Sequence, residues 1–241
     1  MAEKVRHAFI VTSAINSKFG VFKPRERLDQ TLNTIATIKE RVPDALIVVM
    51  ECCGTPINDL QANQIKDVCH VFIDSSNDED VQALYDNDNW DVVKNGTEIM
   101  VFGRVLSILQ KEKILDNVDR VHKMSGRYLL NDEFDLSLYE REDIKDKIVI
   151  GPKYKSQFPI EVTTVPLQYM ARLWSWPQSM TDDITRVYLD SFNFFAERVA
   201  AGGYVDIEHV LYKFLPENQV HEETKLGVEG EIAPTGQRIY N

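Results

Sequence analysis

The chain has 241 residues, 44% of them hydrophobic and 27% charged, which is ordinary for a soluble globular protein with a sizeable core. Its formal net charge of −11 argues against a general nucleic-acid binder and against an anionic-membrane binder. No apolar run is long enough to span a membrane, and the three cysteines have no CxxC spacing, so we expect a cytoplasmic protein with reduced thiols.

The first third of the chain alternates between predicted strands and helices. Apolar runs at residues 7–15, 45–50 and 68–73 are typical of buried parallel strands. Between them, apolar residues at helical spacing predict a long helix over 24–43 and a short one over 56–66. This alternation predicts right-handed β-α-β crossovers, and hence an α/β fold with a mainly parallel central sheet and helices on both faces.

Polar side chains stand where the three predicted strands end, at Ser13, Glu51 and Asp74. The carboxyl ends of parallel strands meet at one edge of the sheet, and open α/β sheets bind their ligands at that edge. The three residues therefore predict a binding site, although each alone would also serve as a turn or helix cap.

The middle of the chain contains a predicted core helix over 97–111, apolar on nearly all sides and begun by Asn95 or Thr97. Arg104 would be buried in it and would need a carboxylate partner or a bound anion. The remaining predicted elements are a short strand at 147–150, an antiparallel strand at 160–165, helices over 181–200 and 205–215, and an irregular tail from residue 217.

Two further motifs each have two interpretations. Asp86 and Asp88 have the spacing of a Mg²⁺ or Mn²⁺ chelate, but they lie in a polar stretch with no strand leading into it, which favours a solvated loop. Trp174 and Trp176 are suited either to stacking on sugars or to core packing, and core packing is the commoner role.

The central stretch 118–135 has the outline of a phosphate site. An apolar alternation runs into Ser125-Gly126, with Lys123 before it and Arg127 after it. A strand that ends in this way offers backbone N–H groups, a hydroxyl and two positive charges to one small anion. The same residues would also make an ordinary tight turn with solvated cations.

The segment 123–128 (KMSGRY), the helix-leading segment 94–96 (KNG) and the late acidic segment 206–209 (DIEH) together resemble the GT-A class of nucleotide-sugar glycosyltransferases. The likeness covers most of the chain and is closest to small bacterial and cyanophage-encoded members with a Lys-x-Ser-Gly-Arg-Tyr motif. It implies one GT-A, Rossmann-like domain with a small antiparallel addition. Residues 1–130 would be the nucleotide-binding half, and residues 131–241 the acceptor and catalytic half.

The resemblance also implies an activity, the transfer of a sugar from a UDP-linked donor to an acceptor hydroxyl. Glu208 or Asp206 would be the general base. The expected donor-binding residues, taken from the strand ends, the third crossover and the central motif, are Thr12, Ser13, Glu51, Asp74, Lys94, Arg104, Lys123, Ser125, Arg127 and Tyr128.

One departure from the class concerns the metal. Where GT-A members usually carry a metal-binding Asp-x-Asp, this chain has lysine, serine and arginine, and cations are able to neutralise a diphosphate directly. A Mn²⁺ or Mg²⁺ ion is therefore left open. Asp119, Asp132 or His221 would be its ligands, and His221 would correspond to the C-terminal metal-contacting histidine of many members.

Two other functions stay open on the sequence. One is a nucleotidyltransferase on a related fold, although residues 12–20 lack the glycine-rich basic loop that such enzymes place after the first strand, and no GxGxxG or GxxxxGK[ST] motif occurs. The other is a carbohydrate- or nucleotide-binding domain without turnover. The aromatic run 188–195 would face the second copy in a homodimer.

Overall fold

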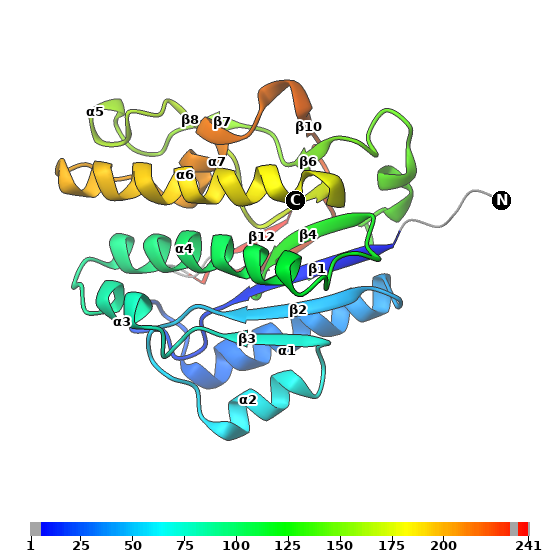
Figure 1. Cartoon of the computed structure of the whole chain (residues 1–241), viewed down its shortest axis with the longest axis horizontal. Coiled ribbons are helices and arrows are strands. Elements are labelled where there is room, and N and C mark those ends of the chain that lie inside the picture. The colour runs from blue at the N-terminus through cyan, green and yellow to red at the C-terminus, as the bar shows by residue number, and fades with distance from the viewer. Residues whose placement is uncertain (1–5, 232–235, 241) are drawn as a thin grey trace.

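The structure, a computed structural model, describes residues 6–231 and 236–240. Its centre is a seven-stranded sheet with the order β10-β6-β9-β4-β1-β2-β3 (Figure 1). Within the described sheet, β9 runs antiparallel to both of its neighbours and the other pairs are parallel. The strands are β1 (His7–Ser13), β2 (Leu46–Glu51), β3 (Val71–Asp74), β4 (Arg120–Ser125), β6 (Ile148–Ile150), β9 (Leu173–Pro177) and β10 (Val220–Glu222). The predicted mainly parallel sheet is confirmed.

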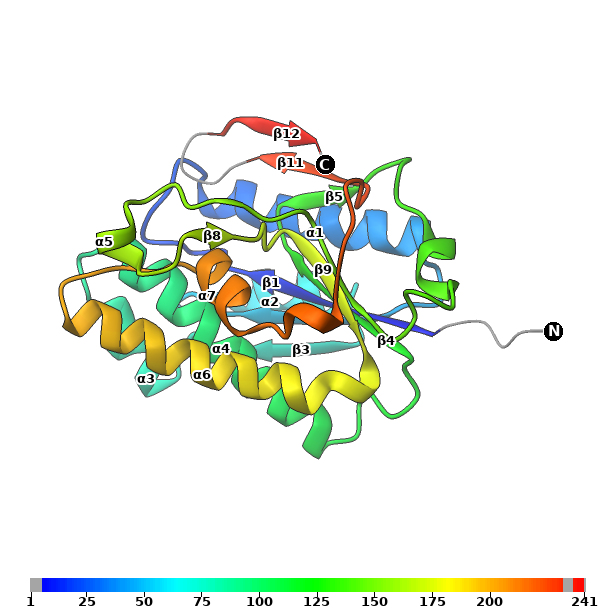
Figure 2. The ribbon, with the colours of Figure 1, turned by 90° about the horizontal axis from the view of Figure 1, so that it is seen from above.

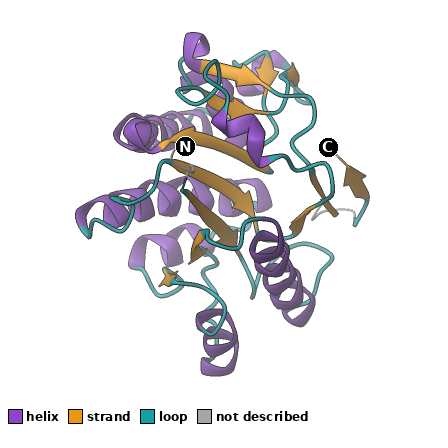
Figure 3. Cartoon of the chain, turned by 90° about the vertical axis from the view of Figure 1, so that its right-hand side faces the viewer, coloured by secondary structure: helices purple, strands orange, loops and turns teal. Residues whose placement is uncertain are grey.

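Helices cover both faces of this sheet (Figure 3). One hydrophobic cluster joins α1 and α2 to one face, and a second joins α4, α6 and α7 to the other. The helices are α1 (Pro24–Arg41), α2 (Asp59–Lys66), α3 (Glu79–Tyr85), α4 (Trp90–Lys111), α5 (Ile160–Thr163), α6 (Thr181–Ala200) and α7 (Ile207–Phe214), with short 3₁₀ turns at Leu136–Glu140, Gln178–Met180 and Glu217–Gln219. No helix in the described part of the chain is long and apolar enough to cross a membrane.

Two small antiparallel sheets complete the fold. The strands β5 (Tyr128–Leu130), β11 (Val228–Glu231) and β12 (Arg238–Tyr240) form one, which lies above α1 in Figure 2, and β7 (Tyr154–Lys155) and β8 (Leu167–Gln168) form the other. The tail predicted to be irregular therefore contains three short strands. β10 and β11 pair with β6 and β5, far away in the sequence, and β12 pairs with β11; the three strands have no clear alternation, so no local signal marks them. Residues 232–235 of that tail lie outside the described residues.

Helix α4 begins seven residues earlier than predicted, at Trp90, because Asn89 caps it by accepting a hydrogen bond from the Asp91 N–H at 2.9 Å. The expected caps, Asn95 and Thr97, are instead buried inside the helix. The Asn95 amide donates to the Tyr204 hydroxyl at 2.8 Å, and its oxygen accepts from the backbone N–H of Ile207 at 3.3 Å. A polar residue that resembled a cap is thus a tertiary anchor between α4 and the start of α7.

The strand predicted at 160–165 is wrong. Residues 160–163 form the single helical turn α5, which follows Pro159 and stops at Thr164 in the left-handed region (φ 57°). The Thr163 hydroxyl then bonds both the N–H and the carbonyl of Val165. These local side-chain bonds to the backbone outweigh the β propensity of the apolar alternation.

The aromatic residues of β9 and α6 form the core of the α4 face. Trp174 and Trp176 are 1% and 0% exposed, so the core interpretation of this pair is confirmed. Tyr188 and Phe195 of α6 are also buried, whereas Phe192 and Phe194 are half-buried, and the homodimer stays a prediction. Leu189, on the same run, is 55% exposed.

Replacing Phe102 with alanine tests the packing of α4. The Phe102 ring is fully buried, with its centroid 4.5 Å from that of Tyr188. We expect Phe102→Ala to lower the free energy of unfolding, measured in urea, by about 3–5 kcal/mol, the usual loss for a buried aromatic ring. The exposed Leu189→Ala should change it by less than about 0.5 kcal/mol. Equal effects of the two substitutions would contradict this packing.

Candidate functional site

The strand ends predicted to share one edge of the sheet do so. Ser13 lies opposite Glu51 in the β1–β2 register, and Glu51 lies opposite Asp74 in the β2–β3 register. On the other side of β1, Thr12 lies opposite Ser125, the last residue of β4. The central motif therefore stands at the same edge of the sheet as the predicted binding residues.

Two adjoining hollows open at this edge of the sheet. They share four wall residues, Trp90, Lys94, Glu98 and Arg127. The first hollow is further lined by residues that include Thr12, Ser13, Ala14, Phe19, Arg27, Cys53 and Tyr85. The second hollow is further lined by residues that include Lys123, Ser125, Tyr128, Gln157, Phe158, Arg172, Tyr204, Asp206 and Glu208.

A buried ion pair forms part of the walls of these hollows. The Lys123 ammonium of β4 is 2.7 Å from the Glu98 carboxylate of α4, and it also donates to Ser125 Oγ at 3.0 Å and to the Ala171 carbonyl at 2.9 Å. Burial alone would raise the pKa of Glu98, but Lys123 and, after it, Lys94 hold that pKa below its usual value. The charge of Lys123 is thus balanced inside the protein and is not free for a ligand.

The turn after β4 aims Arg127 at the shared wall. The Gly126 N–H donates to the Thr12 carbonyl at 2.8 Å, and a Cβ at this position would come within 2.9 Å of the same oxygen and 3.1 Å of Thr31 Oγ1. Glycine is therefore required for the turn to pack on β1. Arg127 then stacks over Tyr128, and its Nε is buried with no hydrogen-bond partner among the described residues.

Arg27 is a site residue that the sequence analysis missed. It lies in the first turn of α1 and lines the first hollow, where its Nε donates to the Ala14 carbonyl at 3.2 Å. Burial lowers the pKa of Arg27 to about 10, and Arg127 contributes to the drop. The sequence did contain a signal for Arg27. It is an arginine in the first turn of the helix that follows the first strand, and that turn lies at the ligand edge of the sheet. Glu98 was missed too, although its spacing of four residues from Lys94 marks a common helix face.

Glu51 lies below the first hollow and does not line it. Its carboxylate accepts hydrogen bonds from Ser13 Oγ at 2.7 Å, from the Ile15 N–H at 3.2 Å and from the Cys53 N–H at 3.0 Å. Burial raises the pKa of Glu51 to about 7, while these hydrogen bonds oppose the rise. The geometry makes Glu51 an internal brace for the loops after β1 and β2, which in turn carry the wall of the hollow.

The two acidic residues of α7 face the second hollow but differ in their contacts. Asp206 caps the helix by accepting from the His209 N–H at 3.0 Å, and it also pairs with the His209 ring at 2.5 Å. Burial raises the pKa of Glu208 to about 7, Asp206 adds to the rise, and Lys94 opposes it. Glu208 is therefore the less engaged carboxylate and the one poised to exchange a proton near neutral pH.

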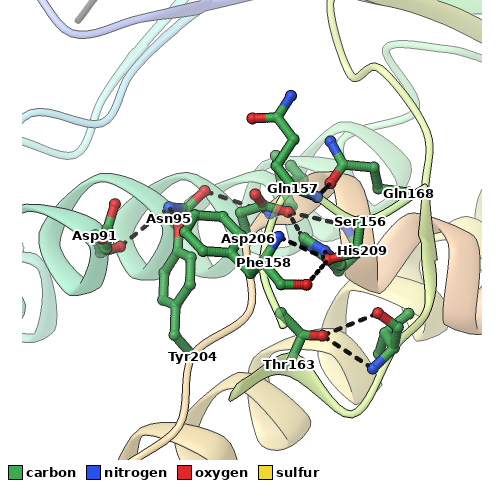
Figure 4. A network of polar contacts seen from close by, with 12 residues as sticks. Asp91, Asn95, Ser156, Gln157, Phe158, Thr163, Gln168, Tyr204, Asp206 and His209 are labelled. Atoms are coloured by element: carbon green, nitrogen blue, oxygen red, sulfur yellow. Dashed lines mark hydrogen bonds and ion pairs between the residues drawn. The ribbon is translucent and has the colours of Figure 1, made fainter. Parts of the chain in front are cut away.

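The contacts of Asp206 continue through His209 to Ser156, whose Oγ lies 2.8 Å from His209 Nε2 (Figure 4). This order of side chains resembles a nucleophilic triad. However, the Ser156 hydroxyl donates to the Phe158 carbonyl at 2.7 Å and accepts from the Phe158 N–H, so it is not free to attack a substrate. The network instead fixes the loop that places Gln157 and Phe158 in the wall of the second hollow.

Two predicted site residues lie elsewhere. The prediction that Arg104 is buried is wrong: it lies at the surface, where it pairs with Asp80 and lies 4.0 Å from Asp78, so the partner-carboxylate alternative holds. The Asp74 carboxylate accepts from the Ser76 N–H at 3.0 Å and caps a local turn. Neither residue lines either hollow.

The residues present do not fit a divalent metal. Among residues 6–231 and 236–240, no group of three or more His, Cys, Asp or Glu side chains is placed to hold an ion. His221 of β10 pairs with Glu223 at 3.4 Å and lies outside both hollows. Asp119 and Asp132, the other expected ligands, pair with arginines at the surface.

No protein-family model and no curated protein matches the chain. Among solved structures, it is similar to core-mannan synthase A from Aspergillus fumigatus in its Mn/GDP form. The superposition has a TM-score of 0.50 and 10% sequence identity, and it covers 96% of this chain and 77% of that one. The fold is GT-A. The sequence resemblance predicted this fold correctly, whereas its narrower likeness to small bacterial and cyanophage-encoded members stays a prediction.

The buried ion pair makes a stability prediction. Because Lys123 is only 1% exposed, Lys123→Met should leave the Glu98 charge uncompensated and lower the free energy of unfolding by about 3 kcal/mol. Lys94→Met is the matched control. Lys94 stands on the same wall and forms no ion pair among the described residues, so its loss should lower the free energy of unfolding by less than about 1 kcal/mol. Urea denaturation at pH 7.5 measures both, and equal losses would show that the pair does not stabilise the fold.

Proposed function

We propose that the protein is a glycosyltransferase that moves a sugar from a nucleotide-sugar donor to an acceptor hydroxyl. The observation that carries the proposal is the pair of adjoining hollows at the ligand edge of a GT-A sheet. Cations stand on their shared wall, and a carboxylate with a pKa of about 7, that of Glu208, faces the second hollow. A sugar transferase needs both kinds of group: cations to stabilise the charge of the leaving diphosphate, and a carboxylate to accept the proton of the acceptor hydroxyl.

The first hollow suits the nucleotide. Aromatic and apolar side chains such as Phe19, Tyr85 and Trp90 line it, and they would enclose a base, while Arg27 and Arg127 would face the phosphates. Thr12 and Ser13 at the end of β1 would lie beside the ribose. The expected donor is UDP-linked, and the GDP bound to the structural neighbour makes a GDP-linked donor the second candidate.

The second hollow suits the acceptor. In the transfer, the bond between the anomeric carbon and the diphosphate oxygen breaks, and its electron pair stays on the diphosphate. A new bond forms between the anomeric carbon and the acceptor oxygen, whose proton passes to Glu208. A carboxylate with a pKa near 7 accepts a proton more strongly than an ordinary glutamate and is still largely ionised just above neutral pH.

Nucleotide binding is the first test. We expect UDP or GDP to raise the melting temperature in a thermal-shift screen that also contains CMP and ADP, each with and without Mn²⁺. Arg127→Gln should remove most of the shift, because Arg127 stands on the wall that both hollows share. The absence of any shift would exclude both the glycosyltransferase and the nucleotidyltransferase. Binding with neither transfer nor hydrolysis of the donor would identify a non-catalytic binding domain.

The pH dependence of turnover is the second test. Glu208 must be ionised to accept a proton, so the rate should fall about tenfold per pH unit below about 7 and level off above it. Glu208→Gln should lower kcat by about 10²–10⁴-fold and abolish this acid limb, while nucleotide binding stays unchanged. The assay is hydrolysis of the nucleotide-sugar, and the measured quantity is the amount of nucleoside diphosphate released. Wild-type kcat in Glu208→Gln would remove Glu208 from the mechanism.

A further inference from the structure

Two guanidinium groups line the first hollow without an acidic partner. Among the described residues, Arg27 donates only to neutral oxygens, those of Ala14 and Gln30, and no carboxylate lies within ion-pair distance of Arg27 or Arg127. The Nε atom of Arg127 is buried and has no hydrogen-bond partner among the described residues. Other arginines of the chain, such as Arg25 and Arg141, form surface ion pairs. Glu51 and Glu98 act on these two arginines only from beyond ion-pair distance, so both guanidinium groups still have donors available for an anion.

The two arginines also oppose each other. They come from different elements, α1 and the turn after β4, and they are close enough that Arg127 lowers the pKa of Arg27. Like charges placed together in a partly enclosed hollow repel, and an anion between them would relieve the repulsion. Each guanidinium presents a planar fork that matches two phosphate oxygens.

The acidic side chains nearby are already engaged. Glu98, the carboxylate of the shared wall, holds Lys123 at 2.7 Å and accepts from Thr12 Oγ1 at 3.3 Å. Glu51 is enclosed by three donors below the hollow. In the first hollow, Glu98 is the one carboxylate among the described lining residues, so a divalent ion beside a phosphate there would lack a free carboxylate and would face the positive charges of Arg27, Arg127 and Lys94.

We propose that Arg27 and Arg127 form a clamp that binds the diphosphate of the donor without a metal ion, with Lys94 as a third cation. This inference rests on the proposed function and names the groups that neutralise its leaving group. Three positive side chains meet the two negative charges of a nucleotide-sugar diphosphate, and the third matches the additional charge that develops when the glycosidic bond breaks.

Isothermal titration calorimetry of the full chain with UDP and with GDP tests the clamp, first in EDTA and then with Mn²⁺. We expect the better of the two ligands to bind in EDTA with a Kd within about threefold of its value in Mn²⁺. Arg27→Gln and Arg127→Gln should each weaken that binding by at least about tenfold, as expected for the loss of hydrogen bonds to a charged group. The matched control is Arg25→Gln on the exposed side of α1, which pairs with Asp29 and should change Kd by less than about twofold.

The outcomes separate the clamp from the function on which it rests. Binding that requires Mn²⁺ would overturn the clamp and leave the glycosyltransferase proposal intact. Binding in EDTA that both Arg→Gln variants retain would also overturn the clamp. Binding of neither nucleotide under either condition would overturn the proposed function itself. If Arg27→Gln does not fold, as judged by circular dichroism, Arg27→Lys replaces it, and loss of the planar fork should still weaken binding several-fold.

Discussion

The buried pair between Lys123 and Glu98 is the contact on which the geometry of the site depends. It joins β4, a central strand, to α4, the helix that forms the wall between the two hollows. Because the pair is almost fully enclosed, its two side chains have little freedom, and a shift of α4 along β4 would separate two charges in a poorly solvated interior. The positions of Lys94, one turn before Glu98, and of Arg127, just after β4, follow from this fixed contact.

Around that contact the fold separates two kinds of chemistry. The first hollow has unpaired guanidinium groups and aromatic walls, which suit a nucleotide, and the second has Glu208 and the loop held by His209. Lys94 and Arg127 stand on the shared wall and line both hollows, and Lys94 opposes the rise in the pKa of Glu208.

The fold was largely predictable from the sequence, because hydrophobic periodicity and strand-end polarity are local signals. They located β1, β2 and β3, the helix α1 and the shared edge at Ser13 and Glu51. The strands β10 and β11 were not predictable, since their partners β6 and β5 lie far away in the sequence. The turn α5 was missed because the local bonds between Thr163 and Val165 override the apolar alternation.

The candidate site was predictable only in part. The motif around Ser125-Gly126 lies at the same edge of the sheet as Ser13 and Glu51, and Glu208 lines the second hollow, while its role as general base stays a prediction. The sequence has no signal that Lys123 is neutralised by Glu98 or that Arg27 points into the same hollow as Arg127, because both facts arise from how α1 and α4 pack. Arg104 appeared buried because apolar residues surround it in sequence, but its side chain lies on the outer face of α4 beside α3.

The anchor between Asn95 and Ile207 has a consequence for how the molecule is made. It links positions 112 residues apart, and β4 gains its β9 partner only from a segment about 50 residues further along the chain. During synthesis, every residue that lines the first hollow is made before α7, whereas the second hollow is complete only once Glu208 has been added. A nascent chain therefore contains the cations of the shared wall before it contains the carboxylate that faces them.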